Sequence, residues 1–246
     1  MQRVWKPLAV FLLLAAAMGL LEAQFKIWRA LSRNMPLGQR ELATQRLGQY
    51  LAEHYAGKKA IILSNPFTQK PGQPREVYRF EKAGLRGLNR GLGTAVAIEA
   101  IVYPELRPEF HQNPAAVYID PTTTTPLSYL VSNEALDAIA QQHPNAEIMV
   151  SLIGLPVNLR QTKTWIQDRG KTFALLLPDL RMVGDQAAIR LALHNRRIAA
   201  FVLNKPGAPP EDQPLGRDLT MEFDQRFLLI TPETVDRYLK AYPHLF

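Results

Sequence analysis

Three short apolar runs, separated by two amphipathic segments, occupy residues 146–206 and restrict the fold more than any other feature of the chain. The runs are AEIMVSLIGLP, KTFALLLPDL and RIAAFVLNKP, and the segments between them are LRQTKTWIQDRG and GDQAAIRLALHNR. Continuous apolar runs of this length are typical of strands buried on both faces, and a segment with one polar side is typical of a covering helix. The stretch therefore predicts strand, helix, strand, helix, strand in a parallel sheet.

The rest of the chain supplies further elements of the same architecture. Apolar spacing predicts helices at 38–55, 133–142 and from 231 to about 242, and strands at 59–63, 94–103 and 226–230. Glycines 84, 87, 91 and 93 precede the second strand, where we expect them to end a helix and turn the chain. Together these patterns predict an α/β domain with a mostly parallel, doubly wound (Rossmann-like) sheet of about six strands and helices on both faces.

The first 23 residues form a targeting segment. Arg3 and Lys6 precede an apolar run at 7–21, and Ala23 stands just before Gln24. The run has 15 residues, which is typical of an export signal, whereas a membrane span needs about 20. We predict a signal peptide at 1–23, a juxtamembrane linker at 24–37 and a single domain at 38–246. Leu21 fits the cleavage pattern poorly, so an uncleaved N-terminal membrane anchor is the alternative.

Composition limits the cellular compartments and the classes of partner that fit this chain. The chain has no cysteine, which excludes disulfides and a lipid anchor on an N-terminal cysteine, and together with an export signal this suits a bacterial periplasm or cell envelope. The net charge is +7, but the basic residues are scattered, with Lys58-Lys59 and Arg196-Arg197 as the only adjacent pairs. This pattern argues against nucleic acid and favours a solvated surface, or one drawn to an anionic membrane.

Motifs for catalysis, metals and cofactors are missing. The five histidines fall on five different segments, and the glycine patterns of dinucleotide and phosphate loops do not follow the first strand. The threonines at 122–125 have no base beside them in the sequence, and G-x-S-x-G is absent. We therefore expect no metal and no cofactor, and the sequence favours binding over catalysis.

Polar residues stand where each predicted strand ends. In an open parallel sheet the ligand crevice lies beyond the carboxyl ends of the strands, so these residues form one candidate edge. The candidate ligand-binding residues are Ser64, Asn65, Asn158, Asp179, Asn204 and Lys205. Asp179 and Lys205 follow neighbouring predicted strands and could form a ligand clamp or a plain ion pair. Each of these residues could also be an ordinary turn residue or helix cap.

Residues 207–225 differ from the elements on either side. The segment is rich in proline, carries five carboxylates and shows no periodic apolar pattern. Nineteen residues is long for a loop in a folded domain. We expect a functional arm or a mobile excursion, and therefore the first internal site of limited proteolysis.

Two stretches resemble a known family. FEKAGLRGLNRGLGTAVAIEAIVYPEL resembles the first helix and second strand of type I periplasmic substrate-binding proteins, and SNEALDAIAQQHPNAEIMVSLIGLP is similar to a helix that leads into a ligand-facing strand of that fold. The resemblance covers about residues 58–206 and implies the fold of one lobe. Family members close two lobes around a ligand, and this chain is long enough for only one lobe.

The sequence therefore predicts an exported envelope protein that acts as a binding module. Its expected partner is a small polar ligand or an envelope protein, with membrane contact through the N-terminus. The alternatives are an envelope enzyme acting on a small polar or glycan substrate, and a membrane-tethered protein-interaction module. An enzyme would place titrating groups in the crevice, whereas an interaction module would expose an apolar patch of several hundred Å².

Overall fold

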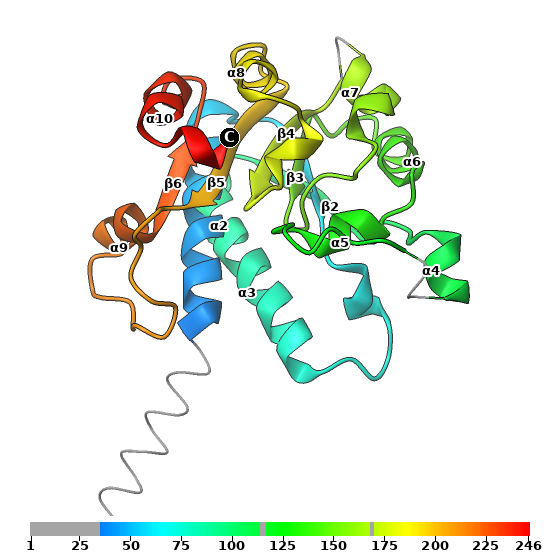
Figure 1. The fold of residues 1–246 in the computed structure, drawn as a ribbon, viewed down its shortest axis with the longest axis horizontal. Coiled ribbons are helices and arrows are strands. Elements are labelled where there is room, and N and C mark those ends of the chain that lie inside the picture. Colours follow the sequence, from blue (N-terminus) through cyan, green and yellow to red (C-terminus); the bar gives the residue numbers. More distant parts are fainter. Residues whose placement is uncertain (1–34, 114–116, 168–169) are drawn as a thin grey trace, which may run out of the picture.

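A six-stranded sheet lies at the centre of the protein (Figure 1). The computed structural model describes residues 35–113, 117–167 and 170–246. The strands are β1 Lys59–Leu63, β2 Ala97–Val102, β3 Ile148–Ser151, β4 Thr172–Leu176, β5 Ile198–Asn204 and β6 Phe227–Ile230. Their order is β2-β1-β3-β4-β5-β6, and every neighbouring pair is parallel except β5 with β6. The predicted α/β class and mostly parallel six-stranded sheet are confirmed.

Helices cover both faces of the sheet (Figure 1). One face carries α2 Met35–His54, α3 Arg75–Leu92 and α9 Leu219–Arg226, and the other carries α6 Ala135–Gln142, α8 Gln186–His194 and α10 Val235–Ala241. Shorter helices are α4 Pro108–Gln112, α5 Pro126–Leu130 and α7 Lys163–Ile166, and the 3-10 turns are Pro66–Gln69, Leu159–Gln161, Leu180–Met182 and Pro243–Leu245. The doubly wound arrangement follows from this alternation.

The two faces of the sheet build two different cores. Phe173 of β4 and Phe201 of β5 point toward α6, α8 and α10, whereas Ala174 and Ala200 beside them point toward α2. All four side chains are fully buried. Alanines on one face leave room for the long helix α2 to pack close to the sheet, and the larger aromatic side chains fill the space under the shorter helices on the other face.

The contact between α2 and α3 corrects one expectation. Glycines 84, 87 and 91 lie inside α3 and do not end it, whereas Gly93 follows its last residue with a φ of 54°. A Cβ on Gly87 would lie 2.1 Å from the carbonyl oxygen of Glu41, and one on Gly91 would lie 2.2 Å from that of Gln45. The two helices therefore pack backbone against backbone, which only glycine allows here.

Two other segments also differ from expectation. The covering helix predicted at 159–170 is reduced to one 3-10 turn and the single turn α7. Thr162 accepts a hydrogen bond from the amide of Trp165 and so begins a new helical turn inside this segment. The segment 207–225 contains most of α9, and its loop is held by Arg226, whose side chain is 2% exposed. Arg226 donates to the carbonyl oxygens of Pro209, Pro210 and Gln213.

The sheet has two dissimilar edges. At β2 the register with β1 shifts, so that Ile98 opposes Ala60, Ala100 opposes Ile61 and Glu99 opposes no residue. Glu99 instead contacts His143 Nδ1 at 3.1 Å, at the partly exposed margin of the sheet. At the other edge, β6 runs antiparallel to its neighbour.

The predicted signal peptide or anchor at 1–23 and most of the linker at 24–37 lie outside the described residues. Within the described ranges, no helix combines the length and apolar character that a membrane crossing requires.

Candidate functional site

The strand order places a crevice between the carboxyl ends of β1 and β3. The chain leaves β1 over the face covered by α3 and leaves β3 over the face covered by α6, so the connections diverge between these strands. Ligands of doubly wound sheets bind at such a point. A cavity of about 250 Å³ lies there, and we call it the Arg40 cavity. Its lining is Arg40, Asn65, Phe80, Glu81, Thr124, Thr125, Pro126, Leu127, Leu152, Ile153, Leu176 and Leu177.

A buried ion pair forms one wall of the Arg40 cavity. Arg40 Nη2 lies 3.1 Å from Glu81 Oε2 and donates to the carbonyl oxygen of Leu152 at 3.2 Å. The side chains of Arg40 and Glu81 are 9% and 5% exposed. Glu81 Oε1 accepts hydrogen bonds from Ser64 Oγ at 2.7 Å and from the backbone amide of Asn65 at 3.3 Å. The pair thus connects α2, α3 and the ends of β1 and β3.

The Arg40 guanidinium is held between two residues of α3. Its carbon lies 4.2 Å from the ring centroid of Phe80, and a Cβ on Gly84 would lie 2.9 Å from Nε. Burial lowers the pKa of Arg40, and the charge and hydrogen bond of Glu81 oppose this shift. Nε has no hydrogen-bond partner among the described residues. A buried ion pair with an unpartnered nitrogen is costly, so its position at the crevice marks a candidate functional group.

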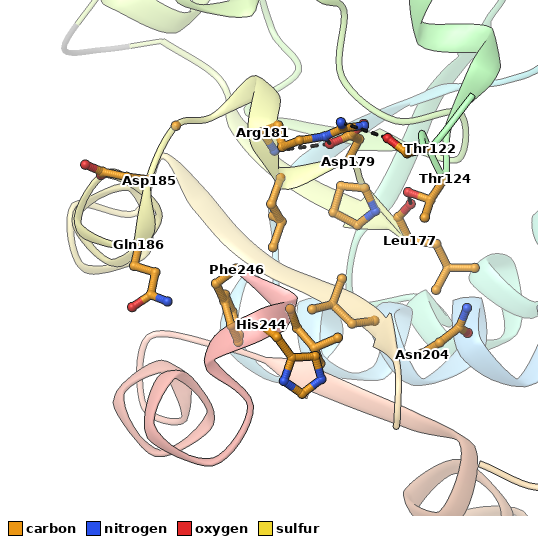
Figure 2. Close-up of a pocket in the computed structure, with 15 residues that line it drawn as sticks. Thr122, Thr124, Leu177, Asp179, Arg181, Asp185, Gln186, Asn204, His244 and Phe246 are labelled. Carbon is orange, nitrogen blue, oxygen red and sulfur yellow. Dashed lines mark hydrogen bonds and ion pairs between the residues drawn. The ribbon is translucent and has the colours of Figure 1, made fainter. Parts of the chain in front are cut away.

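A larger cavity of about 580 Å³ adjoins the first beyond the ends of β4 and β5, and we call it the Asp179 cavity. The two cavities share Thr124 and Leu177. The lining of the Asp179 cavity is Thr122, Thr124, Leu177, Pro178, Asp179, Leu180, Arg181, Gly184, Asp185, Gln186, Leu203, Asn204, His244, Leu245 and Phe246. Figure 2 shows Asn204 and His244 on the opposite side of the cavity from Arg181.

A polar network around Asp179 forms the upper wall of its cavity in Figure 2. Asp179 accepts hydrogen bonds from Arg181 Nε at 2.8 Å, Arg181 Nη2 at 2.5 Å, the backbone amide of Arg181 and Thr123 Oγ1 at 2.8 Å. Arg181 Nη1 donates to Asp120 Oδ2 at 2.8 Å and to Thr122 Oγ1 at 3.1 Å. Four donors saturate the Asp179 carboxylate. Asp179 therefore fixes Arg181, whose half-exposed guanidinium faces the cavity.

The network sets the protonation state of Asp179. Burial acts to raise the pKa of Asp179, but the hydrogen bonds from Arg181 and Thr123 and the charge of Arg181 outweigh it, so the pKa lies below its ordinary value. The same contacts raise the pKa of Arg181, with the Asp179 hydrogen bond as the largest cause. Both groups are charged at neutral pH.

Leu177 forms part of the wall between the two cavities in a strained conformation. Its φ is 46°, in the left-handed region, and it directly precedes Pro178. Its amide donates to the carbonyl oxygen of Val202 at 2.9 Å, which holds it at the end of β4. A left-handed non-glycine residue costs about 1–2 kcal/mol. Strain of this kind is concentrated at binding sites, and here it lies between both cavities.

The structure brings some of the predicted residues together and separates others. Asp179 and Asn204 line the Asp179 cavity, Asn65 lines the Arg40 cavity, and Ser64 lies buried behind it against Glu81. Strands β4 and β5 are neighbours, as the hypothesis of an Asp179–Lys205 pair requires. The pair itself is wrong, because Asp179 binds Arg181, whereas Lys205 Nζ donates to the carbonyl oxygen of Asp224.

Lys205 and Asn158 lie outside both cavities. Lys205 lines a separate hollow beside β6, together with Asp224 and Phe227. Asn158 Nδ2 donates to the carbonyl oxygen of Asn133 at 2.9 Å, which joins two loops. A role of either residue in ligand binding is therefore a weaker proposal than the same role for Asn204.

Sequence reasoning did not select Arg40, Glu81 or Arg181. Glu81 lies seven residues before Leu88, on the buried side of α3, and a charged residue within an apolar stripe is a detectable signal of a buried ion pair. Arg181 stands two residues after Asp179, which alone is a weak signal. Among the residues that the structure describes, no group of three or more His, Cys, Asp or Glu side chains could hold a metal ion. The cavities offer hydrogen bonds, fixed charges and apolar surface.

No family model matches the chain, and no curated protein matches it. Solved structures that resemble its fold include a galactofuranose binding protein, with 12% identity and a TM-score of 0.46, over 85% of this chain and 64% of that one. A periplasmic solute binding protein of an ABC transporter from Actinobacillus succinogenes, with bound D-allose, shares 10% identity and a TM-score of 0.42, over 81% and 62%.

A sugar ABC transporter protein from Actinomyces odontolyticus shares 11% identity and a TM-score of 0.42, over 81% of this chain and 63% of that one. The chain spans less than two thirds of the length of each of these three structures. These structures resemble the chain weakly, and only in fold. This agrees with the resemblance to one lobe of type I periplasmic substrate-binding proteins that the sequence shows.

Proposed function

We propose that the protein binds a small polar molecule in the Asp179 cavity. The observation that carries this proposal is the cavity itself, about 580 Å³ at the carboxyl edge of a parallel sheet, with a fixed guanidinium on one side and amides on the other. This volume falls in the range of sites for small ligands. Leu177, Pro178 and Leu203 provide apolar surface beside these polar groups.

The fixed charges around the cavity select the class of ligand. Arg181 is neutralised by Asp179 and Asp120, and Asp185 adds a further carboxylate to the lining. An anionic ligand would meet an excess of carboxylates, whereas hydroxyl or amine groups could donate to Asp185 and to the side-chain oxygen of Asn204. The proposed ligand is therefore a neutral or cationic molecule with several hydroxyl or amine groups.

Asn204 offers the cleanest test of this proposal. It is exposed at the end of β5 and lines the cavity opposite Arg181. Native mass spectrometry of the purified protein, followed by calorimetric titration with a panel of monosaccharides, polyols, amino alcohols and carboxylic acids, identifies the class. We expect Asn204→Ala to weaken binding at least tenfold, with a melting temperature within about 2 °C of the wild type.

Asn89→Ala is the matched control, because Asn89 is an exposed amide on α3 that lines neither cavity. It should bind like the wild type. The proposal fails if carboxylic acids bind and the hydroxyl and amine compounds do not. It also fails if Asn204→Ala binds the identified ligand with unchanged affinity.

In this proposal the protein works in the periplasm or cell envelope. Support comes from the sequence of residues 1–23, with basic residues, a 15-residue apolar run and Ala23 at the expected cut. N-terminal sequencing of the envelope fraction should give a start at Gln24. Recovery of intact Met1 in the membrane fraction would instead favour the anchored form.

A further inference from the structure

The outward face of α3 carries a continuous basic stripe. Its members are Arg75, Arg79, Lys82, Arg86 and Arg90. Successive helix residues are rotated by about 100°, so positions spaced by three and four fall on one face, within about 80° of each other. All five side chains are exposed, opposite the glycines that pack on α2. The stripe extends for about 22 Å along the helix.

Among the described residues, two carboxylates lie beside this stripe. Glu41 of α2 forms ion pairs with Arg86 and Arg90, and Glu76 lies in the first turn of α3. Glu81 points to the opposite side, where it binds Arg40. Counted with these two carboxylates, the five cations carry an excess of three positive charges within the part of the chain that the structure describes. An exposed excess of this kind attracts an anionic surface.

One aromatic side chain flanks the stripe near the start of α3. Tyr78 is 37% exposed and lies next to Arg75 and Lys82 around the helix, whereas Phe80 lies on the side of α3 that faces Arg40. Aromatic side chains beside basic ones are typical of helices that lie in the interface of a bilayer. A nucleic-acid surface would also attract these charges, so the test below includes duplex DNA.

The N-terminal segment enters at the same end of the helix pair. Residues 24–34, which remain after the proposed cut at Ala23, lead into α2, and their sequence contains Phe25 and Trp28 with the basic residues Lys26, Arg29 and Arg33. The Arg40 guanidinium stacks on Phe80, and Arg40 lies about one and a half turns from the start of α2. A basic and aromatic segment at a membrane surface would therefore hold the beginning of α3 close to the lipid.

We infer that the basic face of α3, Arg75 to Arg90 with Tyr78, docks on an anionic lipid bilayer. This inference is independent of the proposed ligand, because no residue of α3 lines the Asp179 cavity. It assigns the membrane contact to the folded domain as well as to the N-terminus. The domain would then be held in a defined orientation on the membrane.

The test measures partitioning of the full chain onto vesicles by sedimentation. The vesicles contain 70% phosphatidylcholine and 30% phosphatidylglycerol, or phosphatidylcholine alone, and the ratio of the two partition coefficients removes the common contribution of the apolar run. The first variant carries Arg75→Gln, Arg79→Gln and Lys82→Gln. Each basic side chain near an anionic surface multiplies partitioning by about five, so we expect this ratio to fall about 100-fold.

A control variant with the same net charge as the first variant separates the effect of this helix face from the effect of net charge. Arg160→Gln, Lys163→Gln and Lys240→Gln also remove three positive charges, from exposed residues on the other side of the sheet. This variant should change the ratio less than threefold. An equal fall in both variants would overturn the inference, because net charge alone would then explain the attraction.

A second variant keeps the charge but changes the side chains, with Arg75→Lys, Arg79→Lys and Lys82→Arg. It should keep the wild-type ratio, and its melting temperature checks that the helix is intact. Loss of vesicle binding here would contradict an electrostatic contact. The inference also fails if the first variant loses affinity for duplex DNA and keeps its affinity for anionic vesicles.

Discussion

Asp179 holds Arg181 in position and has no acceptor position left for a ligand. All four of its acceptor positions are taken by Arg181 and Thr123, and its side chain is 5% exposed. A buried carboxylate without these donors would be very costly. Asp179 is therefore a positioning residue. Arg181 and Asn204 face the cavity and are available to a ligand.

Replacing Asp179 with Asn should destabilise the protein in a pH-dependent manner. The amide cannot accept all four hydrogen bonds, and we expect a loss of about 2–3 kcal/mol at pH 7. The folded-state pKa of Asp179 is lowered, so its contribution is present above the unfolded pKa of about 4 and is lost as the pH falls through the folded pKa.

Urea unfolding of both proteins at pH 7, 4 and 3 measures this prediction. The difference in unfolding free energy between them should shrink as the pH falls. Other carboxylates titrate in both proteins and cancel in the difference. A gap that stays constant between pH 7 and pH 3 would show that the charge of Asp179 contributes nothing.

The sequence identified Asp179 as a candidate but could not identify its partners. A polar residue after a buried strand is visible in any linear pattern, whereas Thr123 lies 56 residues away and Asp120 lies 61 residues from Arg181. Only the path of the chain over the sheet brings them together. The same holds for Arg40 and Glu81, which are 41 residues apart on two helices.

Among the elements, the α2–α3 pair depends most on backbone contact. Replacing Gly87 with Ala would place a Cβ 2.1 Å from the carbonyl oxygen of Glu41, and both helix backbones would have to move apart. We expect a loss of about 3 kcal/mol or more in unfolding free energy, measured by denaturant titration followed by far-UV circular dichroism. Asn89→Ala, on the exposed side of α3, should stay within about 0.5 kcal/mol of the wild type.

The acidic segment 207–225 should resist proteolysis better than its composition indicates. Arg226 binds three carbonyl oxygens of this segment and also Glu222, at 3.0 Å. We expect Arg226→Met to expose the loop, so that limited trypsin and thermolysin digestion cuts between residues 207 and 218 first. The wild type should be cut there no faster than elsewhere. Rapid wild-type cleavage at this loop would show that the Arg226 contacts are too weak to order it.

Element prediction succeeded where one local pattern dominated. The strand at 59–63 has the predicted bounds, and α8 falls inside the predicted segment 184–196, because apolar runs and Asp185 as a cap are local signals. The prediction that the glycines of α3 end the helix was wrong for three of them, because glycine ends many helices. Only the contact with α2 shows why they lie inside this one. The shortened α7 reflects a capping threonine inside an amphipathic stretch.

The whole molecule has two cores that share one sheet, so we expect the two cores to unfold together. Leu88 in the α2 layer and Leu136 in the α6 layer are both buried, at 0% and 2% exposure. Leu88→Ala and Leu136→Ala should each cost about 2–5 kcal/mol. Each variant should still unfold in one transition, with circular dichroism and tryptophan fluorescence giving the same midpoint. Separate midpoints would mean that the layers are independent.

The two margins of the sheet bear on how the protein behaves when it is concentrated. A strand margin offers unpaired amides and carbonyls to any other chain, which is how sheets join into fibrils. Here one margin is interrupted by the extra residue Glu99, and the other presents an antiparallel strand of only four residues. In the described part of the chain, a second copy would find no long, regular template on either side. Crowded copies should therefore stay separate instead of stacking strand on strand.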